Sequence, residues 1–181
     1  REGRTRELME AFIAALPEGC QVTRLRLEEE NLYCLTGAFF EAREALLAQG
    51  KLDHPRFRYA HQFAQADEIV VAAPFWDLSF PALLKVYIEQ ISVDGITFHS
   101  EHGGLKGMCR AENLVYLTTR GGIYTGDPME MGSRYMDAMH SFFGIRKYTC
   151  IAADAMDMSR YDGKAILQKA KDEAAALAKS F

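Results

Sequence analysis

The segment PFWDLSFP, residues 74–81, gathers Phe75, Trp76 and Leu78 in the connection that follows an apolar run. Connections usually lie on the protein surface, so apolar side chains concentrated in one have something to cover. A flat ligand fits, because aromatic side chains can lie along a ring while backbone N–H groups meet its polar edge. A contact with a second subunit fits as well, since exposed aromatic residues also mark interfaces.

A second candidate segment is TTRGGIYTGDP, residues 118–128. The pair Gly121 and Gly122 allows the backbone to lie directly against a ligand. Arg120 or the neighbouring N–H groups can then stabilise negative charge that develops on that ligand. The alternative interpretation is an ordinary Gly-Gly turn without any ligand.

A third candidate segment is REGRT, residues 1–5, at the predicted start of a helix. Unpaired N–H groups and the helix dipole favour an anion at such a position. Gly3 lets the chain turn closely, while Arg4 and the hydroxyl of Thr5 can add hydrogen bonds. A helix cap flanked by solvated arginines is the alternative.

Four apolar stretches are predicted to be the strands that position these segments. Residues 68–74 and 113–119 are continuously apolar, as is typical of parallel strands covered on both faces. Residues 21–27 alternate between polar and apolar side chains, which favours an outer strand. Residues 147–153 form the fourth candidate.

Helical periodicity separates the predicted strands. The pattern begins after Pro55 and Pro81 in two places, because proline is favoured in a first helical turn. The predicted helices are residues 8–16, 39–49, 57–66, 84–91 and 166–177, with one more between 119 and 147.

This alternation predicts an α/β protein with a doubly wound parallel sheet in three layers, forming one domain over residues 1–181. The chain opens on a helix start, so we expect a first strand to precede Arg1. With that strand the sheet has five strands, which suits the flavodoxin-like order 2-1-3-4-5. In that order a ligand sits outside the carboxyl ends of the strands, where the three candidate segments converge.

Composition excludes several other classes of protein. The balance of 21 basic and 25 acidic residues gives a net charge of only −4, which weakens any nucleic-acid or anionic-membrane interpretation. The four cysteines lie far apart without a CxxC pair, so we expect reduced thiols and no metal site. No run approaches the about 18 apolar residues of a membrane helix, and no signal peptide is evident. We therefore expect a soluble cytoplasmic protein.

The segments PFWDLSFPALLKVYIEQISVDGITF and YLTTRGGIYTGDP, about 40 residues apart, together resemble the FMN-dependent NADH azoreductase and NAD(P)H quinone reductase family of flavodoxin-like enzymes. The likeness begins at GRTREL and extends to the last helix. Of the two central motifs, neither alone is specific, whereas the pair in this order is.

The resemblance implies which residues bind FMN. Gly3, Arg4 and Thr5 match the segment that holds the phosphate, where serines are common in the family. The loop from Pro74 to Leu78 matches the one along the isoalloxazine, with Asp77 where many members have Asn. The complete implied set is Gly3, Arg4, Thr5, Pro74, Phe75, Trp76, Asp77, Leu78, Thr119, Arg120, Gly121, Gly122 and Tyr124.

The resemblance also implies an activity and an assembly. Hydride passes from NADH or NADPH to FMN and then to a quinone, azo compound or similar flat acceptor in a ping-pong order, so no protein nucleophile is required. The active site is expected at a homodimer interface. The alternatives are a flavodoxin-like electron carrier, which binds FMN without a small-molecule substrate, and a receiver-like signalling domain. The fold alone does not separate these functions.

Overall fold

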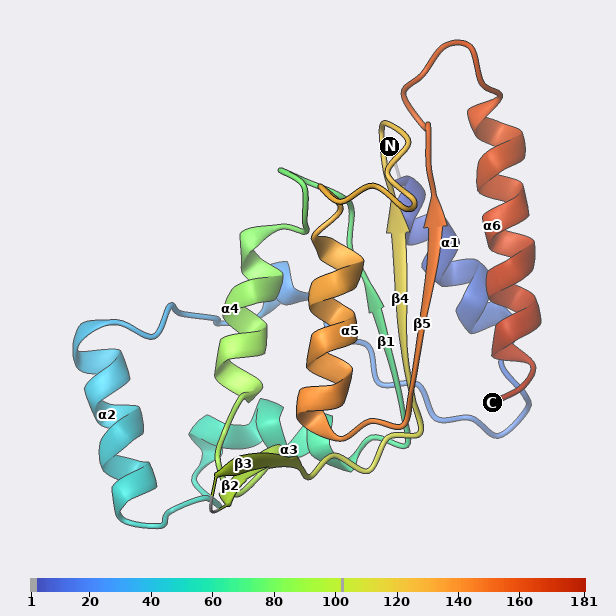
Figure 1. Ribbon diagram of the computed structural model, residues 1–181. Coiled ribbons are helices and arrows are strands. Elements are labelled where there is room, and N and C mark those ends of the chain that lie inside the picture. The colour runs from blue at the N-terminus through green and yellow to red at the C-terminus, as the bar shows by residue number, and fades with distance from the viewer. Residues whose placement is uncertain (1–2, 102) are drawn as a thin grey trace.

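A parallel sheet of three strands forms the centre of the molecule. The computed structural model describes residues 3–101 and 103–181 (Figure 1). The strands are β1 (Glu68–Ala72), β4 (Asn113–Thr119) and β5 (Lys147–Ala153), in the order β1-β4-β5. Strand β4 pairs in parallel with both neighbours, so all three strands end at the same edge of the sheet.

Helices cover both faces of this sheet (Figure 1). Helices α1 (Arg4–Ala14) and α6 (Gly163–Ala178) pack together on one face. Helices α3 (Arg58–Gln65), α4 (Ala82–Ile91) and α5 (Gly132–Phe143) lie on the other face. These layers confirm the α/β class and the parallel sheet predicted from the sequence.

The side chains of β4 alternate between two separate cores. Leu114 and Tyr116 belong to the cluster that includes residues of α3, α4 and α5. Val115 and Leu117 belong to the cluster with α1 and α6. All four are at most 1% exposed. Burial on both faces explains why this strand is apolar throughout rather than alternating.

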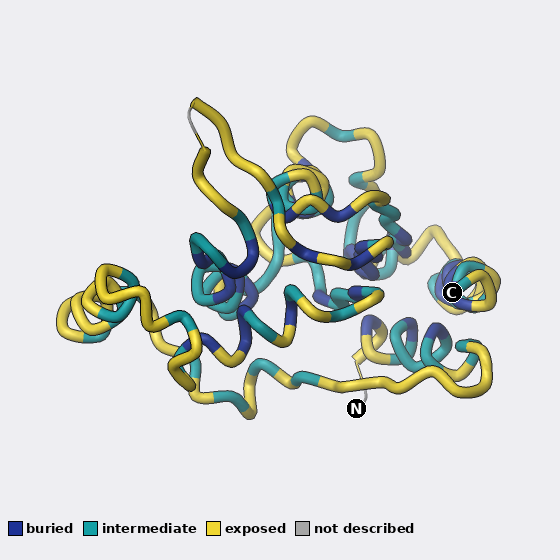
Figure 2. Tube along the Cα trace, turned by 90° about the horizontal axis from the view of Figure 1, so that it is seen from below, coloured by how far each residue is buried: buried dark blue, intermediate teal, exposed yellow. Residues whose placement is uncertain are grey.

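The remaining elements lie outside these layers. Helix α2 (Gly37–Ala48) contains no buried residue and stands apart on the left of Figure 1, and Figure 2 shows its largely exposed surface. Strands β2 (Phe98–Glu101) and β3 (Gly104–Gly107) form an antiparallel hairpin. Two short 3₁₀ helices, Leu27–Glu29 and Pro55–Phe57, precede α2 and α3 respectively.

The predicted helices and three of the predicted strands are confirmed, with shifted ends. Strands β4 and β5 match their predicted ranges, and β1 ends two residues early, at Ala72. Pro55 begins a 3₁₀ turn, and α3 follows it. The hairpin of β2 and β3 was not predicted, because four-residue strands carry too short a pattern.

The prediction of a strand at residues 21–27 is wrong for the structure described. Residues 21–26 are irregular, Leu27 begins a 3₁₀ helix, and the stretch is mostly exposed. In the order 2-1-3-4-5 such a strand needs the first strand as its hydrogen-bonding neighbour, and no segment within residues 3–101 and 103–181 occupies that place beside β1. A lone strand leaves its N–H and C=O groups unpaired. The full order of five strands stays a prediction.

Two further observations bear on the class of protein. No described helix is long and apolar enough to cross a membrane. Among the described residues, no three His, Cys, Asp or Glu side chains come together in a way that could hold a metal ion.

Two glycines of β3 provide a test of the packing between the hairpin and α5. A Cβ atom on Gly107 would lie 2.0 Å from the backbone nitrogen of Gly144, whereas one on Gly104 would meet nothing within 4 Å. We expect Gly107→Ala to lower the free energy of unfolding by roughly 2–3 kcal/mol, as overpacking does. Gly104→Ala is the matched control and should change it little. Urea unfolding measures both, and equal stabilities would contradict the predicted contact.

Candidate functional site

Three segments meet where the strands end. The first residues of α1 reach the end of β4, because the buried Thr5 Oγ1 lies 2.6 Å from Thr119 Oγ1. The chain leaving β1 stays beside β4 as well, since the N–H of Phe75 donates to the carbonyl of Thr119 at 3.2 Å. The structure thus brings together the three segments that the sequence analysis expected to converge, with residues 1 and 2 of the first lying outside the described part of the chain.

The N-terminus of α1 is open to an anion. Gly3 is the N-cap, and no side chain caps the helix. The backbone N–H groups of Arg4 and Thr5 donate to no other group of residues 3–101 and 103–181. The guanidinium of Arg4 donates to the carbonyl of Met156 at 2.8 Å and to Oδ1 of Asp157 at 2.9 Å. Free donors, a helix dipole and a cation therefore coincide here.

The segment after β1 forms a tight turn with an apolar surface. Trp76 and Ser79 exchange both backbone hydrogen bonds, at 3.0 and 2.8 Å, and enclose two residues with positive φ, Asp77 (48°) and Leu78 (67°). Two successive positive φ values are the pattern of a type I′ turn. Trp76 is 60% exposed and Leu78 is 40% exposed, so the turn presents apolar surface to the outside.

Pro74 and Phe75 join this turn to the glycine segment after β4. Both residues are partly buried. The rings of Phe75 and Tyr124 pack with their centroids 4.6 Å apart at 46°. This aromatic pair fixes the spacing between the two segments, and such pairs contribute about 0.5–1.5 kcal/mol beyond the area they bury.

The glycines after β4 lie against the segment that follows β5. The carbonyls of Gly121 and Gly122 accept from the N–H groups of Asp157 at 3.0 Å and Ala155 at 2.7 Å. A Cβ atom on Gly121 would come within 2.6 Å of the Asp157 carboxylate, so a side chain there would displace that carboxylate. The N–H groups of both glycines donate to no other group in the described part of the chain. The segment thus offers two free donors at the edge of the site.

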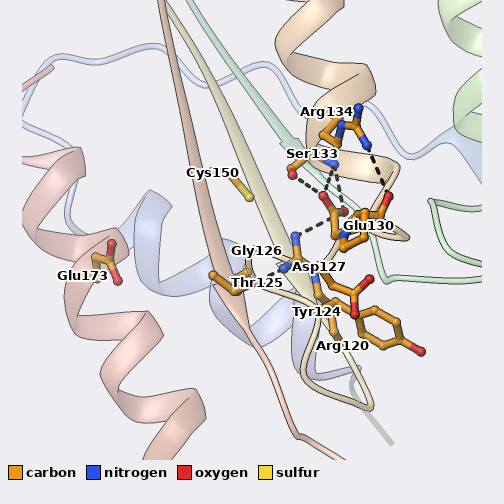
Figure 3. Close-up of a pocket in the computed structure, with 12 residues that line it drawn as sticks. Arg120, Tyr124, Thr125, Gly126, Asp127, Glu130, Ser133, Arg134, Cys150 and Glu173 are labelled. Carbon is orange, nitrogen blue, oxygen red and sulfur yellow. Dashed lines mark hydrogen bonds and ion pairs between the residues drawn. The ribbon is translucent and has the colours of Figure 1, made fainter.

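Arg120 is buried between two carboxylates, those of Glu130 and Asp154, and Figure 3 shows its contact with Glu130. Its side chain is 3% exposed, and its terminal nitrogens lie 3.2 Å from Glu130 and 3.3 Å from Asp154. It also donates to the hydroxyl of Thr125 at 3.2 Å. The guanidinium therefore holds three parts of the chain together, whereas the sequence analysis considered that either it or the neighbouring N–H groups could stabilise negative charge on a ligand.

A cavity of about 590 Å³ has Arg120 in its lining. It opens between α5 and α6 along the outer edge of β5, with Arg134, Cys150 and Glu173 around it (Figure 3). Of the predicted FMN residues it touches only Arg120 and Tyr124. The cavity is thus lined by one of the three converging segments, residues 118–128, and by no described residue of the other two.

The sequence analysis assigned no role to Asp154, Asp157 or Glu130, although all three contact the predicted site residues. Asp154 is the most connected, because its Oδ2 accepts from the N–H groups of Tyr124 at 3.0 Å and Thr125 at 2.7 Å. Its position directly after a strand that ends at the ligand edge was the signal available in the sequence.

The pKa of Asp154 is lowered in the folded protein. Burial alone would raise the pKa of this carboxyl, but the hydrogen bonds from Thr125 and Tyr124 and the charge of Arg120 outweigh burial. Asp154 therefore stabilises the fold in its ionised form.

Comparison with known proteins places these features in a family. A family described by its flavodoxin-like fold matches residues 1–178. An FMN-dependent NADH:quinone oxidoreductase of Clostridium acetobutylicum is 40% identical over 164 residues, which cover 89% of this chain and 82% of that relative. Another from Clostridium perfringens is 35% identical over 188 residues, covering 99% of this chain and 92% of that protein.

Solved structures agree with the fold. The crystal structure of an azoreductase from Bacillus anthracis superimposes with a TM-score of 0.87 at 27% identity, covering 99% of this chain and 93% of that one. An FMN-dependent NADH-azoreductase of Bacillus anthracis in complex with FMN gives a TM-score of 0.85 at 21% identity, covering 97% and 90%. At this lower identity the second comparison supports the fold alone.

The lowered pKa of Asp154 predicts how stability depends on pH. Since the folded pKa is below the ordinary 3.8, its contribution is present above pH 3.8 and is lost as the pH falls through the folded pKa. We expect Asp154→Asn to lower the free energy of unfolding by about 1–2 kcal/mol at pH 7, and the difference to shrink at pH 3. Urea unfolding of both proteins at the two pH values measures this. An equal difference at both would contradict the assignment.

Proposed function

The chain belongs to the family with the flavodoxin-like fold that includes FMN-dependent NADH:quinone oxidoreductases, and from this premise we propose that it is an FMN-dependent NAD(P)H oxidoreductase. Its acceptors are quinones, azo compounds or similar flat molecules, and residues 1–181 act as one FMN-binding domain. The observation that carries the proposal is the meeting of three segments at the carboxyl ends of β1 and β4, one with anion-binding character and two suited to a flat ring.

The FMN phosphate is assigned to the start of α1. Gly3 provides no side chain that would compete for the free N–H groups of Arg4 and Thr5. The Arg4 guanidinium adds a charge-assisted bond, and the Thr5 hydroxyl adds a further donor. Arg4 is already held by Asp157, so its side chain is oriented before any phosphate arrives.

The flavin ring is assigned to the two segments after β1 and β4. Pro74, Phe75, Trp76 and Leu78 supply the apolar contact along the ring. The N–H groups of Asp77, Leu78, Gly121 and Gly122 donate to nothing else in the described residues, so they are available to its nitrogen and oxygen acceptors. Thr119 and Tyr124 border the same space, joined to it through Thr5 and Phe75 respectively.

Bound FMN would supply the hydride-transfer chemistry between NAD(P)H and the acceptor. The protein orients both substrates and excludes water, so no side chain is assigned as a nucleophile. Because Arg120 is paired with Glu130 and Asp154, the N–H groups of Gly121 and Gly122 are the better source of stabilisation for negative charge on the ring. NAD(P)H and the acceptor use one apolar surface in turn, which is a ping-pong order.

Five exposed apolar residues lie in or directly after the two segments assigned to the ring, and we call them the apolar rim. Their exposures range from 40% to 60%, and the N–H of Met131 donates to the carbonyl of Leu78 at 2.9 Å, which joins the two halves of the rim. Exposed apolar surface of this kind is costly in a monomer, so we assign the rim to a homodimer contact as well as to the ring. The rim consists of Trp76, Leu78, Ile123, Met129 and Met131.

The activity predicts a two-step spectroscopic result. We expect the purified protein to bind FMN, the visible absorbance of bound FMN to bleach on anaerobic addition of NADH or NADPH, and the absorbance to return when a quinone is added. Bleaching without return would contradict the proposed acceptors. Binding without bleaching by either nucleotide would favour the electron carrier, and a failure to bind FMN would contradict the whole assignment.

The rim predicts a dimer that depends on Met129. Light scattering of the FMN-loaded protein should give twice the 20.4 kDa chain mass. We expect Met129→Lys to weaken dimerisation by at least about 10-fold, because a buried unpaired charge is strongly unfavourable at an interface. Leu105→Lys is the control, since Leu105 is 60% exposed against 53% for Met129 but lies on β3. A monomeric native protein, or an equal effect of both variants, would contradict the rim as the interface.

A further inference from the structure

The segment after β5, residues 154–157, contacts both ends of the proposed FMN site. At the phosphate end, Met156 and Asp157 accept the two hydrogen bonds from Arg4. At the ring end, Ala155 and Asp157 donate to the glycine segment. Ala155 has a φ of 60°, which is unfavourable for a residue other than glycine and shows that its surroundings fix this conformation.

Asp154 anchors this segment to the ring end. One carboxylate oxygen accepts from two successive N–H groups, those of Tyr124 and Thr125, and the other lies 3.3 Å from the Arg120 guanidinium. Two N–H groups that point at one oxygen fix the direction of the backbone between them. The chain immediately before Tyr124 carries the free donors of Gly121 and Gly122, and the Tyr124 ring packs on Phe75.

The pairing of Arg120 makes the Asp154 carboxylate difficult to replace. Arg120 is buried, and its charge is balanced by Asp154 and Glu130 together. An amide in place of Asp154 can turn its oxygen toward Tyr124 and Thr125, but it then presents N–H donors to a guanidinium that has none but donors itself. The link that Asp154 makes between the Arg120 guanidinium and the backbone of Tyr124 and Thr125 is therefore lost even where the backbone hydrogen bonds survive.

We propose that Asp154 is a positioning residue, which holds the segment from Gly121 to Tyr124 in the conformation that receives the flavin ring. The inference rests on the proposed function, and it assigns to Asp154 a role that acts through Tyr124 and Arg120, without contact to the cofactor. Because Asp154 acts at the ring end, it contributes equally to the affinity for flavins with and without a phosphate.

Asp162 provides a matched control on the same connection. Its carboxylate also accepts from two successive N–H groups, those of Lys164 and Ala165, where it caps α6. It contacts none of the proposed FMN residues. Loss of Asp162 therefore removes a comparable pair of hydrogen bonds from the fold without affecting the site.

The test compares the affinities of Asp154→Asn and Asp162→Asn for FMN and for riboflavin by fluorescence titration, with melting temperatures of the flavin-free proteins. We expect both variants to melt at lower temperature. Asp154→Asn should weaken the binding of FMN and the binding of riboflavin by the same factor, about 10-fold for an interaction worth 1.4 kcal/mol. Asp162→Asn should leave both affinities unchanged.

Two outcomes would overturn the proposal. If Asp154→Asn lowers the melting temperature but binds both flavins with native affinity, its role is structural only. If Asp154→Asn weakens the binding of FMN and leaves the affinity for riboflavin unchanged, the effect lies at the phosphate end. A native protein that binds no flavin would instead contradict the proposed function.

Hydrogen exchange in the native protein keeps the proposal testable if Asp154→Asn does not fold. The amide hydrogens of Tyr124 and Thr125 should already be protected from exchange without FMN, because Asp154 holds them in advance. Free exchange at both positions until FMN is added would show that the segment is ordered by the ligand, and it would overturn the proposal.

Discussion

The parallel pairing of β4 with β1 and β5 is the constraint on which the site depends. Since β4 is hydrogen-bonded on both sides and buried on both faces, it has one possible place in the fold. Parallel strands end at a common edge, so the chain leaves β1, β4 and β5 within hydrogen-bonding distance of one another. The bond from the N–H of Arg120 to the carbonyl of Ala153, at 2.8 Å, continues this pairing beyond the sheet. Residues far apart in the sequence thereby become neighbours.

The burial of Arg120 determines how the loops beyond that edge are arranged. A guanidinium with 3% exposure requires opposite charge close by, because an unpaired buried charge is strongly destabilising. Glu130 and Asp154 supply it from two different connections, and the three formal charges sum to −1. Positive potential toward a ligand must therefore come from other groups, namely the start of α1 and the free N–H groups of the glycine segment, since Arg4 is itself paired with Asp157. The interior charge organises the loops, while the exposed donors remain available for binding.

The turn at Asp77 and Leu78 combines two features that a stable fold would normally avoid. Both residues have positive φ, which costs about 1–2 kcal/mol for a residue with a Cβ atom. Asp tolerates this region better than most residues, but Leu does not. The same turn exposes the side chains of Trp76 and Leu78. Strain and apolar exposure in one turn are consistent with a surface that is shaped for binding, since neither contributes to stability. This also gives a structural reason for Asp77, where either Asp or Asn suits the backbone.

The sequence alone determined the layers, the family resemblance and the three segments of the candidate site. Hydrophobic periodicity and the positions of Pro55, Pro81 and the paired glycines are local signals. The continuous apolar run of β4 likewise predicts its burial on both faces. Residues 21–27 show the limit of such signals, because a strand forms only beside a hydrogen-bonding partner, and the alternating pattern cannot report whether the partner is there. The roles of Arg120 and Asp154 were likewise decided by tertiary structure. The sequence does not distinguish an arginine that faces a ligand from one that faces a buried carboxylate. The partner of Arg120 is visible only in the tertiary structure, because Asp154 lies more than 30 residues away in the sequence.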